Sequence, residues 1–427
     1  MREQISPARR VSGAVQPPGD KSMSHRYAML AAIAEGTSRI ANYSTGADCQ
    51  STLACLESLG VLIERSDDEV RIHGAGLHGL RAPSEMLDAG NSGSTIRMLS
   101  GILAAQSFES RIGGDGSLSG RPMDRIMLPL GDMGAKIEAN DGRFPPLTIS
   151  GRPLHSIEYK LPVPSAQVKT CVLFAGLHAD GETVVNEPIR TRDHTELALR
   201  EFGAEICVER RRISVRGPAH LEARDLTVPG DISSAAFFLV SALIVSDSNL
   251  MIHGVGLNPT RSALLDFLAA MGAEIKIVQL QQTAGELVGD VQVRKSRIRG
   301  GAVLEKDQSA ALIDEIPILA VLGAASEDGL VVRDAAELRV KESDRIASIA
   351  KNFDSMGLAI DVHPDGFKIP GGQRFHAAPL DSFGDHRIAM AFSVAALAAD
   401  GRCSMDSAEA ASISFPDFYD TLRRIAE

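Results

Sequence analysis

Tryptophan is absent from the sequence, and aromatic residues make up only 4% of its 427 positions. This scarcity disfavours a surface that stacks nucleic-acid bases, as does the net charge of −11. The five cysteines are scattered and no metal-ligand spacing occurs, so we expect reduced cysteines and no bound metal. No apolar run approaches the roughly 18 residues of a membrane-spanning helix, and no apolar signal core opens the chain. We therefore expect a cytoplasmic protein that binds neither membranes nor nucleic acids.

What the sequence does contain is typical of a soluble globular protein, with 44% apolar and 23% charged residues. A chain of 427 residues is too long for one ordinary hydrophobic core. Two domains are therefore the first expectation.

An internal repeat dominates the organisation of the chain. The stretch PPGDKSMSHRYAMLAAIAEGTSRI from Pro17 resembles VPGDISSAAFFLVSALIVSDSNLMI from Val228. Both contain Pro-Gly-Asp, a serine-rich turn, an apolar helix-like run and a return strand. Four looser copies begin at Asp88, Pro164, Asp314 and Gly384. At a period of about 70 residues, each copy is long enough to be a small αβ subdomain, and six copies indicate two domains of three.

Each copy contributes an apolar helix, and most copies add a second, amphipathic one. The first helix is apolar on nearly all faces, which is typical of a helix buried in the middle of its domain. The second, as in STLACLESLGVLIE, has a polar face and should lie outside. A glycine follows a bulky residue where the amphipathic stretch ends, which favours a left-handed helix C-cap.

Polar side chains gather where the apolar helices begin. A helix N-terminus offers unpaired N–H groups and a partial positive charge, so anions bind there. If the helix starts converge within each domain and the domains face each other, the gap should hold a substrate with several negative groups. The first three copies supply Lys21, Ser22, His25, Arg26, Asn91, Gly93, Ser94, Arg97, Ser165, Gln167 and Lys169. The last three supply Asp231, Ser233, Ser234, Asp314, Glu315, Asp385, His386 and Arg387.

Several of these groups have a structural alternative. Asp231, Ser233 and Ser234 are better explained as ordinary N-caps. His25 is equally well explained as a core imidazole or as a functional group. Lys21 and Arg26 are harder to explain structurally, because cations at a helix start oppose the helix dipole. A Walker A loop is excluded as the reason, because an aspartate precedes the lysine where that motif has glycine.

Two stretches between the repeats add charge. SGRPMDR supplies Arg121 and Arg125, and LRVKESDR supplies both acids and bases around Glu342. Taken alone, the second is better explained as a solvated helix start. Together with Asp314 and the His386–Arg387 pair, it offers carboxylates that move protons beside cations that clamp phosphate.

These motifs together resemble one enzyme family. PGDKSMSHR, GNSGSTIRML, GRPMDR, SAQVK, RDHTE, LRVKESDR and GDHRIAM are similar, in this order, to motifs of the 5-enolpyruvylshikimate-3-phosphate synthase family. The resemblance runs from about residue 15 to about residue 418. It implies an α/β fold, the two-domain inverse α/β prism, with six βαβαββ repeats and three per domain. One domain would comprise residues 1–20 plus 231–427 and the other residues 21–230, with the active site in the interdomain cleft.

The resemblance also implies a reaction and its residues. The family transfers the enolpyruvyl group of phosphoenolpyruvate to the 5-hydroxyl of shikimate 3-phosphate, and it uses no metal or organic cofactor. Shikimate 3-phosphate would be held by Ser22, Arg26, Ser165, Gln167, Arg192, Asp314 and Lys341. Phosphoenolpyruvate would be held by Lys21, Arg121, Arg345, Arg387 and the backbone near Gly93. Asn91 and Ala166 are expected among the substrate contacts.

The catalytic groups implied by the resemblance are fewer. Glu342 is expected to protonate the methylene carbon, and Asp314 to accept the hydroxyl proton. Lys341 would share this proton transfer with help from His386, and Lys21 would reach both substrates.

The chain departs from the family pattern at two places, Ser414 and Met98. Ser414 stands where some members have a lysine, which puts one phosphoenolpyruvate contact in doubt, and Met98 replaces a proline near the Gly93 loop. Gly93 resembles the herbicide-sensitive form, so glyphosate should compete with phosphoenolpyruvate. A monomer is usual for the family and is expected here.

Two other functions fit these residues less well. The sister enzyme that transfers enolpyruvate to UDP-N-acetylglucosamine typically has a reactive cysteine where this chain has Gly116. A non-catalytic anion-binding protein would have no use for the carboxylates of Glu342 and Asp314 in a site that binds anions.

Overall fold

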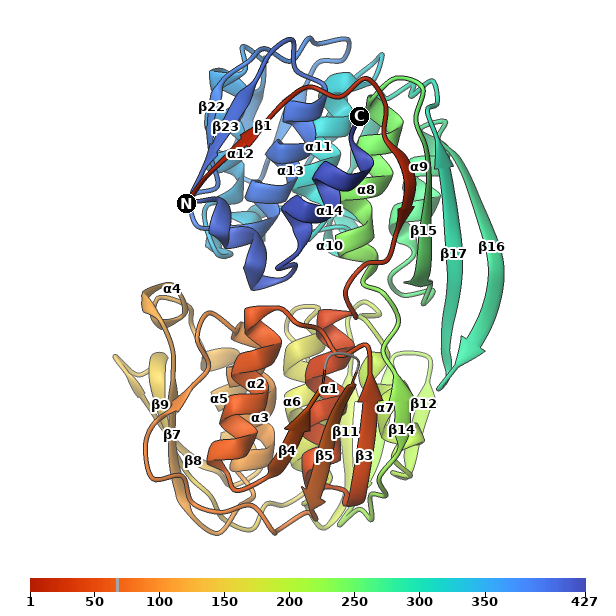
Figure 1. Ribbon diagram of the computed structural model, residues 1–427. Helices are drawn as coiled ribbons and strands as arrows, with labels where there is room; N and C mark the ends of the chain where they lie inside the picture. Colours follow the sequence, from red (N-terminus) through yellow and green to blue (C-terminus); the bar gives the residue numbers. More distant parts are fainter. Residues whose placement is uncertain (67–68) are drawn as a thin grey trace. The chain divides into compact units, whose positions relative to one another are not determined.

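Apart from one three-residue excursion, the chain passes between two compact units after Pro18 and after Val228. The computed structural model describes residues 1–66 and 69–427. The terminal unit contains both chain ends and comprises Met1–Pro18, Pro229–Gln282 and Glu286–Glu427, whereas the middle unit comprises Gly19–Val228 with Thr283–Gly285 (Figure 1).

An apolar helix lies at the centre of each repeat. In the middle unit these helices are α1 (Lys21–Ile33), α3 (Gly93–Leu103) and α6 (Ala166–Gly176). In the terminal unit they are α8 (Ile232–Ile244), α11 (Ile316–Ala325) and α13 (His386–Leu397). Nearly every side chain of these helices is buried, which confirms the all-apolar pattern.

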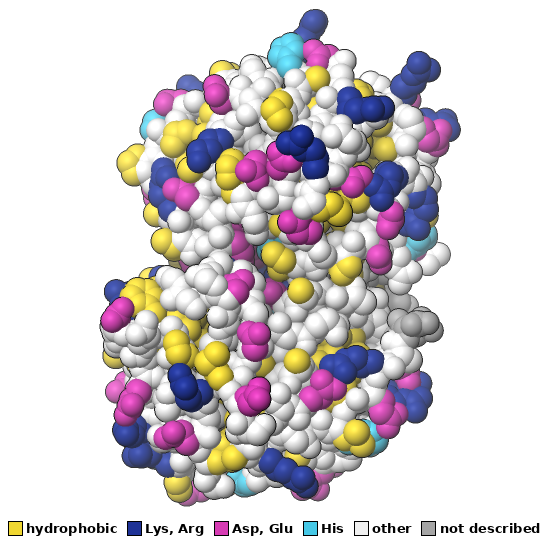
Figure 2. Space-filling model, turned by 60° about the vertical axis from the view of Figure 1, so that its left-hand side comes forward, with side chains coloured by type: hydrophobic (Ala, Val, Ile, Leu, Met, Phe, Trp, Pro, Cys, Tyr) yellow, Lys and Arg dark blue, Asp and Glu magenta, His cyan; other side chains and the backbone are white. Residues whose placement is uncertain are grey.

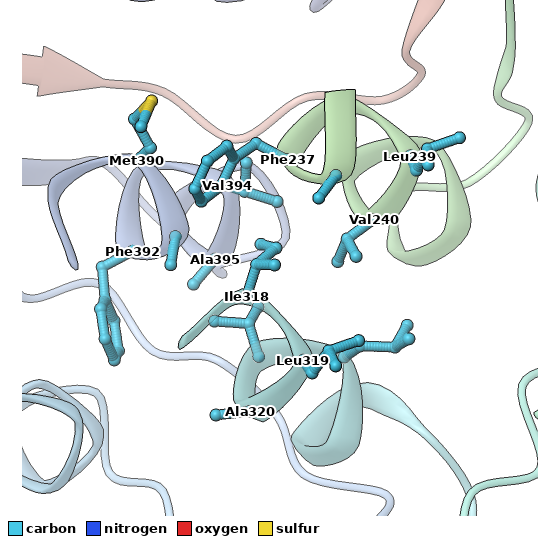
Figure 3. Packing of buried hydrophobic residues seen from close by; sticks show 14 of the residues in the cluster. Phe237, Leu239, Val240, Ile318, Leu319, Ala320, Met390, Phe392, Val394 and Ala395 are labelled. Carbon is cyan, nitrogen blue, oxygen red and sulfur yellow. The ribbon is translucent and has the colours of Figure 1, made fainter. Parts of the chain in front are cut away.

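The three central helices of the terminal unit pack against one another and form its core. Figure 3 shows Val240 of α8, Ile318 of α11 and Ala395 of α13 meeting there. Because each helix is buried along nearly its whole length, a polar group inside it needs a buried partner, whereas the first residues are less covered.

The amphipathic helices form a second set with one polar face. They are α2 (Ala47–Ser58), α5 (Asp124–Asp132), α7 (His194–Glu201), α9 (Ala263–Ala270) and α12 (Arg345–Ser355). The glycine after each has a positive φ, as the sequence predicts for a left-handed C-cap. These glycines are Gly60, Gly134, Gly203, Gly272 and Gly357, with φ between 72° and 100°. The shorter helices are α4 (Gly116–Ser119), α10 (Lys306–Ala311), α14 (Phe418–Ile425), η1 (Ala336–Val340) and η2 (Ala408–Ile413).

Six small sheets surround the helices in the described residues, three in each unit. Four of the five four-stranded sheets have the spatial order first, second, fourth, third, and in the fifth a strand from the end of the middle unit takes the first place. The first strand is parallel to the second, and the second is antiparallel to the fourth. This common order confirms that the repeats share one fold.

Within the part of the chain that the structure describes, the middle unit has three four-stranded sheets, whose strands are named in their spatial order. One contains β6 (Leu87–Asp88), β7 (Glu109–Gly113), β9 (Phe144–Ser150) and β8 (Lys136–Asn140). The next contains β10 (Glu158–Lys160), β11 (Gly181–Asn186), β13 (Arg212–Gly217) and β12 (Ile206–Glu209). The third contains β14 (Asp225–Thr227), β3 (Glu35–Ala41), β5 (Glu69–Ala75) and β4 (Leu62–Arg65).

The terminal unit has two sheets of the same kind and one shorter sheet. The first contains β2 (Ser12–Val15), β15 (Asn249–Gly256), β17 (Glu286–Arg294) and β16 (Glu274–Thr283). The second contains β18 (Ala302–Leu304), β19 (Leu330–Val332), β21 (Gly366–Ile369) and β20 (Asp361–His363). The three-stranded sheet contains β22 (Pro379–Asp381), β23 (Cys403–Asp406) and β1 (Arg2–Ile5).

Strands remote in sequence complete three of these sheets. β14 precedes the second crossing, and it provides the first strand beside β3. β2 precedes the first crossing, and it plays the same part beside β15. β1 pairs antiparallel with β23 and takes the place of a fourth strand. Each crossing strand is therefore built into a sheet next to the point where the chain changes unit.

The surface agrees with a globular protein of mixed charge. On the face shown in Figure 2, acidic and basic side chains are interspersed over each unit. Among the described helices, none is long and apolar enough to cross a membrane.

His25 lies in the core of the middle unit rather than at its surface. Its side chain is fully buried on α1, and its Nδ1 lies 2.7 Å from Oγ1 of Thr52. Thr52 in turn hydrogen-bonds to Thr95, so the imidazole joins a buried polar chain. Burial, followed by the nearby charges of Lys21 and Arg26, lowers the pKa of His25 well below its usual value of 6.5. Of the two alternatives, the structure favours the core imidazole.

This burial predicts a pH dependence of stability. Below pH 6.5 an unfolded His25 takes up a proton that the folded residue refuses, so the unfolded state binds more protons. The free energy of unfolding should then fall as pH decreases through 6.5, by up to about 1.4 kcal/mol per pH unit from this residue. Urea titrations one pH unit above and one below that value should show a smaller loss for His25→Asn than for the unmodified protein. The exposed His220→Asn serves as control, and an equal loss in all three proteins would contradict the prediction.

Candidate functional site

Lys21 begins α1 and faces a carboxylate of the neighbouring helix. Asp20 caps α1 by accepting a hydrogen bond from the backbone N–H of Met23 at 2.9 Å. The Nζ of Lys21 lies 3.0 Å from Oδ2 of Asp48, in the first turn of α2. This partner explains how a cation is tolerated at a helix start, because Asp48 offsets the unfavourable dipole interaction.

Ser22 is contacted by two arginines. Arg26 is buried and donates to the backbone oxygen of Ser22 at 2.8 Å. Arg192 comes from the segment before α7, and its Nη1 donates to Oγ of Ser22 at 3.4 Å. Residues 170 positions apart in sequence therefore meet at the start of α1.

The start of α3 is held by a network around Asn91. Its Oδ1 accepts from Nη2 of Arg121 at 2.7 Å, and its Nδ2 donates to Oδ2 of Asp115 at 2.7 Å. Arg121 also donates to Ser117 Oγ at 3.0 Å. Gly93 is the first residue of α3, and a Cβ there would lie 2.7 Å from Nη1 of Arg97. Larger side chains at Gly93 would therefore displace an arginine.

The start of α6 is linked to α3 by side chains. Ser165 caps α6, and the partly exposed Ala166 follows as its first residue. The Oε1 of Gln167 accepts from Arg97 at 3.0 Å, while its Nε2 donates to Ser94 Oγ at 2.9 Å. We call a set of residues at the starts of α1, α3 and α6, together with Arg121 and Arg192, the middle-unit cluster. Its members are Lys21, Ser22, Arg26, Asn91, Gly93, Ser94, Arg97, Arg121, Ser165, Ala166, Gln167 and Arg192.

Lys169 was expected in this cluster, and that expectation is wrong. Its side chain is fully buried, with Nζ 2.6 Å from Oε1 of Glu196 and 3.1 Å from Oε1 of Glu187. The position lies one turn inside α6, where a side chain meets the core instead of the helix end.

Arg345 is the centre of the corresponding group in the terminal unit. Its side chain is 1% exposed, and its Nε donates to Oδ2 of Asp385 at 2.8 Å. Its Nη2 donates to Oε2 of Glu342 at 2.6 Å, and Nη1 lies 3.8 Å from Oδ1 of Asp314. Burial opposes the charged guanidinium, but the carboxylates of Asp385, Glu342 and Asp314 outweigh it and raise the pKa of Arg345 above its usual range.

Arg387, on α13, approaches Asp314 as Arg345 does. Its Nη1 donates to the backbone oxygen of Asp314 at 2.8 Å, and its Nη2 lies 3.9 Å from Oδ2. His386 is buried at the first position of α13, directly before Arg387. Lys341 adjoins Glu342 in sequence, and its Nζ lies 3.9 Å from Oε1 of Glu337. We call Asp314, Lys341, Glu342, Arg345, His386 and Arg387 the terminal-unit cluster.

The N-cap explanation holds for Asp231. Its carboxylate accepts from the backbone N–H of Ser233 at 2.8 Å. The hydroxyl of Ser233 contacts Glu315 and accepts from Arg261 at 2.6 Å. Ser233 thus joins a buried polar network within the terminal unit.

Sequence reasoning missed the acidic partners of the cations. In the sequence, Asp48 and Asp115 are only acidic residues near a helix start, and Glu196 is only the last residue of the motif RDHTE. Nothing in these patterns indicates which cation each acid pairs with. Among the described residues, no group of three or more histidine, cysteine or acidic side chains could hold a metal ion. What the structure assembles is cations suited to bind anions, beside carboxylates suited to move protons.

Comparisons with known proteins agree with one another. Residues 5–422 match the family model of EPSP synthase (3-phosphoshikimate 1-carboxyvinyltransferase). The chain is 62% identical to the 3-phosphoshikimate 1-carboxyvinyltransferase of Solibacter usitatus, with 100% of both chains covered. It is 53% identical to that of Koribacter versatilis, with 99% of each covered.

Solved structures extend the likeness to the fold. EPSP synthase from Acinetobacter baumannii aligns with a TM-score of 0.88 and 42% identity, over 100% of this chain and 98% of that one. The enolpyruvyl transferase NikO from Streptomyces tendae aligns with a TM-score of 0.78 over 99% of this chain and 97% of that one. At 19% identity, the second likeness concerns the fold alone.

Proposed function

The chain belongs to the EPSP synthase family, and from this premise we propose how its two side-chain clusters share the work of the reaction. The enzyme transfers the enolpyruvyl group of phosphoenolpyruvate to shikimate 3-phosphate, a step of the shikimate pathway that leads to chorismate and the aromatic amino acids. Both substrates are polyanions, so cations must offset their mutual repulsion before they can react. The observation that carries the proposal is that both clusters present cations already fixed by neighbouring acids or hydroxyls.

We assign the two units to the two domains expected from the sequence, residues 21–230 and residues 1–20 plus 231–427. In this proposal, neither cluster is complete by itself. The carboxylates that transfer protons lie in the terminal-unit cluster, whereas most anchors of shikimate 3-phosphate lie in the middle-unit cluster. The reaction therefore draws on both.

Shikimate 3-phosphate is assigned mainly to the middle-unit cluster. Ser22, Arg26, Ser165, Gln167 and Arg192 are its proposed anchors there, with Ala166 beside them. The contact of Arg192 with Ser22 supports this assignment, because it brings a guanidinium to a helix start where an anion is already favoured. Asp314 and Lys341 of the terminal-unit cluster complete the set.

Phosphoenolpyruvate is assigned to cations of both clusters. Lys21 and Arg121 are proposed from the middle unit, with Asn91 orienting Arg121 through its hydrogen bond. Arg345 and Arg387 are proposed from the terminal unit. The backbone near Gly93 adds N–H donors at the start of α3.

Proton transfer is assigned to the carboxylates around Arg345. Asp314 is proposed to accept the hydroxyl proton, with Lys341 sharing and His386 assisting, and Glu342 to protonate the methylene carbon. In the structure Glu342 is hydrogen-bonded to Arg345. A phosphate bound to Arg345 competes for that guanidinium, which favours protonation of Glu342 when substrate is present.

Replacing Arg192 tests the assignment of shikimate 3-phosphate. Mixing the enzyme with both substrates should release inorganic phosphate, whereas UDP-N-acetylglucosamine in place of shikimate 3-phosphate should not. Arg192→Ala should raise the KM for shikimate 3-phosphate by roughly ten- to a hundredfold, because a charge-assisted contact is lost. Arg190→Ala is the matched control, since the Arg190 side chain is 60% exposed and solvent therefore screens its ion pair with Asp193. No phosphate release with shikimate 3-phosphate would overturn the proposed function, and an unchanged KM would overturn the role of Arg192.

Glu342→Gln tests the proton-transfer assignment. The amide keeps the size of the side chain but cannot donate an acidic proton, so turnover should fall by about 10²–10⁴-fold. The affinity for shikimate 3-phosphate, measured by titration calorimetry, should stay nearly unchanged. Glu327→Gln, which alters an exposed ion pair in the same unit, should leave turnover unaffected. Near-normal turnover of the Glu342 variant would refute this role.

Glyphosate is proposed as a competitor of phosphoenolpyruvate, because Gly93 leaves the start of α3 without a side chain. Initial rates at rising glyphosate should show an increasing apparent KM for phosphoenolpyruvate and an unchanged maximal rate. Gly93→Ala should weaken inhibition, and it should also raise the KM for phosphoenolpyruvate, because the new methyl group displaces Arg97 and contacts Arg121, a proposed ligand of that substrate. Undiminished turnover at saturating glyphosate would disprove the proposal.

A further inference from the structure

A buried ion triad lies beneath the middle-unit cluster. The ammonium of Lys169, on α6, contacts Glu196 at 2.6 Å and Glu187 at 3.1 Å. The three side chains are 0%, 5% and 1% exposed, respectively. Burial raises the pKa of Glu196 above its usual value, and Lys169 opposes that rise.

The two carboxylates stand at the two ends of one segment. Glu187 directly follows β11, and Glu196 lies in the first turn of α7. Glu187 also accepts hydrogen bonds from the backbone and the hydroxyl of Thr191. A single cation on α6 thus ties down both ends of residues 187–196, the segment that carries Arg192.

The residue next to Glu196 extends this tie to α1. Thr195 Oγ1 accepts from Nε of Arg26 at 2.7 Å, and it lies 2.6 Å from Oγ1 of Thr170. Thr170 donates to the backbone oxygen of Ala166, so its oxygen is left to accept from Thr195 and from Arg26. Consecutive residues of α7 therefore hold Lys169 and Arg26.

The positions of both arginines at Ser22 follow from these contacts. Arg26 reaches the backbone of Ser22 while bonded to Thr195, and Arg192 reaches the hydroxyl of Ser22 from the tied segment. A shift of residues 187–196 would move one arginine directly and loosen the other.

Stability alone is a weak reason for such a triad. Burying one ammonium and two carboxylates carries a large desolvation cost, and well-packed apolar side chains often stabilise a core as well or better. What an apolar replacement would not supply is a directional link between α6 and both ends of the segment. The triad therefore fits a demand for geometry.

We propose that Lys169 is a positioning residue for shikimate 3-phosphate, which acts by tying Glu187 and Glu196 and so holding Arg192 and Arg26 at Ser22. This inference rests on the proposed function, since it assumes that those arginines bind this substrate.

Lys169→Met tests the proposal in the phosphate-release assay. Methionine keeps an unbranched side chain of nearly the same length but removes the cation, so the segment should lose its fixed position. The KM for shikimate 3-phosphate should rise roughly ten- to a hundredfold, with far smaller changes in kcat and in the KM for phosphoenolpyruvate. Glu196→Gln keeps the size of its side chain and weakens the tie, so it should shift the same constant in the same direction by a smaller factor.

A stability control separates positioning from general destabilisation. Val215→Ala makes a cavity in the buried core beside β11, at a position whose partner in that strand, Thr183, lies outside the segment. It should lower the melting temperature yet leave the KM for shikimate 3-phosphate unchanged. If Val215→Ala raised that KM as much as the triad variants do, or if both triad variants left it unchanged, the proposal would be overturned.

A double variant separates this inference from the proposed function. If Lys169 acts partly through Arg192, combining Lys169→Met with Arg192→Ala should raise the KM by less than the product of the two single effects, because the part that runs through Arg192 is already lost. Fully additive effects would overturn the positioning role. If Arg192→Ala alone left the KM unchanged, the assignment of Arg192 to shikimate 3-phosphate would fail. If Arg192→Ala raised the KM but neither Lys169→Met nor Glu196→Gln did, only the positioning role of Lys169 would be overturned.

Discussion

A helix that is covered on every side can present polar groups only at its ends, and this constraint governs where chemistry is possible in the molecule. α8 buries twelve of its thirteen residues, and α13 buries all of its residues. Their flanks are then mostly apolar, and groups that bind a substrate are expected at the first turn, where unpaired N–H groups already favour anions. The start of α13, with His386 and Arg387, shows the result.

Charged side chains that are largely buried at helix starts need partners before any substrate arrives. Arg345 has three carboxylates around it, and Lys21 has Asp48. Leaving one buried charge unpaired would cost several kcal/mol, so the acids are a condition of folding as much as of catalysis. The same pairing fixes the cations in place, which reduces the ordering that an anionic substrate must otherwise impose.

The parts of the fold that depend on local pattern could be predicted from the sequence, and those that depend on distant partners could not. The apolar helices follow from periodicity and the glycines at positive φ from backbone sterics, and the structure confirms both. The pairing of Lys21 with Asp48 joins separate helices, and no single-sequence pattern encodes it. Lys169 was misjudged for a related reason. Its place near a helix start suggested a cleft residue, but one turn further in, the side chain points into the core toward acids of another helix.

The two Pro-Gly-Asp copies lie at the two points where the chain changes unit, and each combines a close backbone approach with a helix cap. In the first copy, a Cβ on Gly19 would lie 1.9 Å from the backbone oxygen of Asn42, just after β3. In the second, a Cβ on Gly230 would lie 3.1 Å from the backbone oxygen of Gly254 in β15, the strand equivalent to β3. The glycine thus lets the incoming chain pass close to the repeat's second strand. The aspartate that follows caps the buried helix, so the close passage and the helix start are one feature. Lys21 comes next in the chain, which places the first cation of the middle-unit cluster at the end of a helix that is buried from Met23 onward.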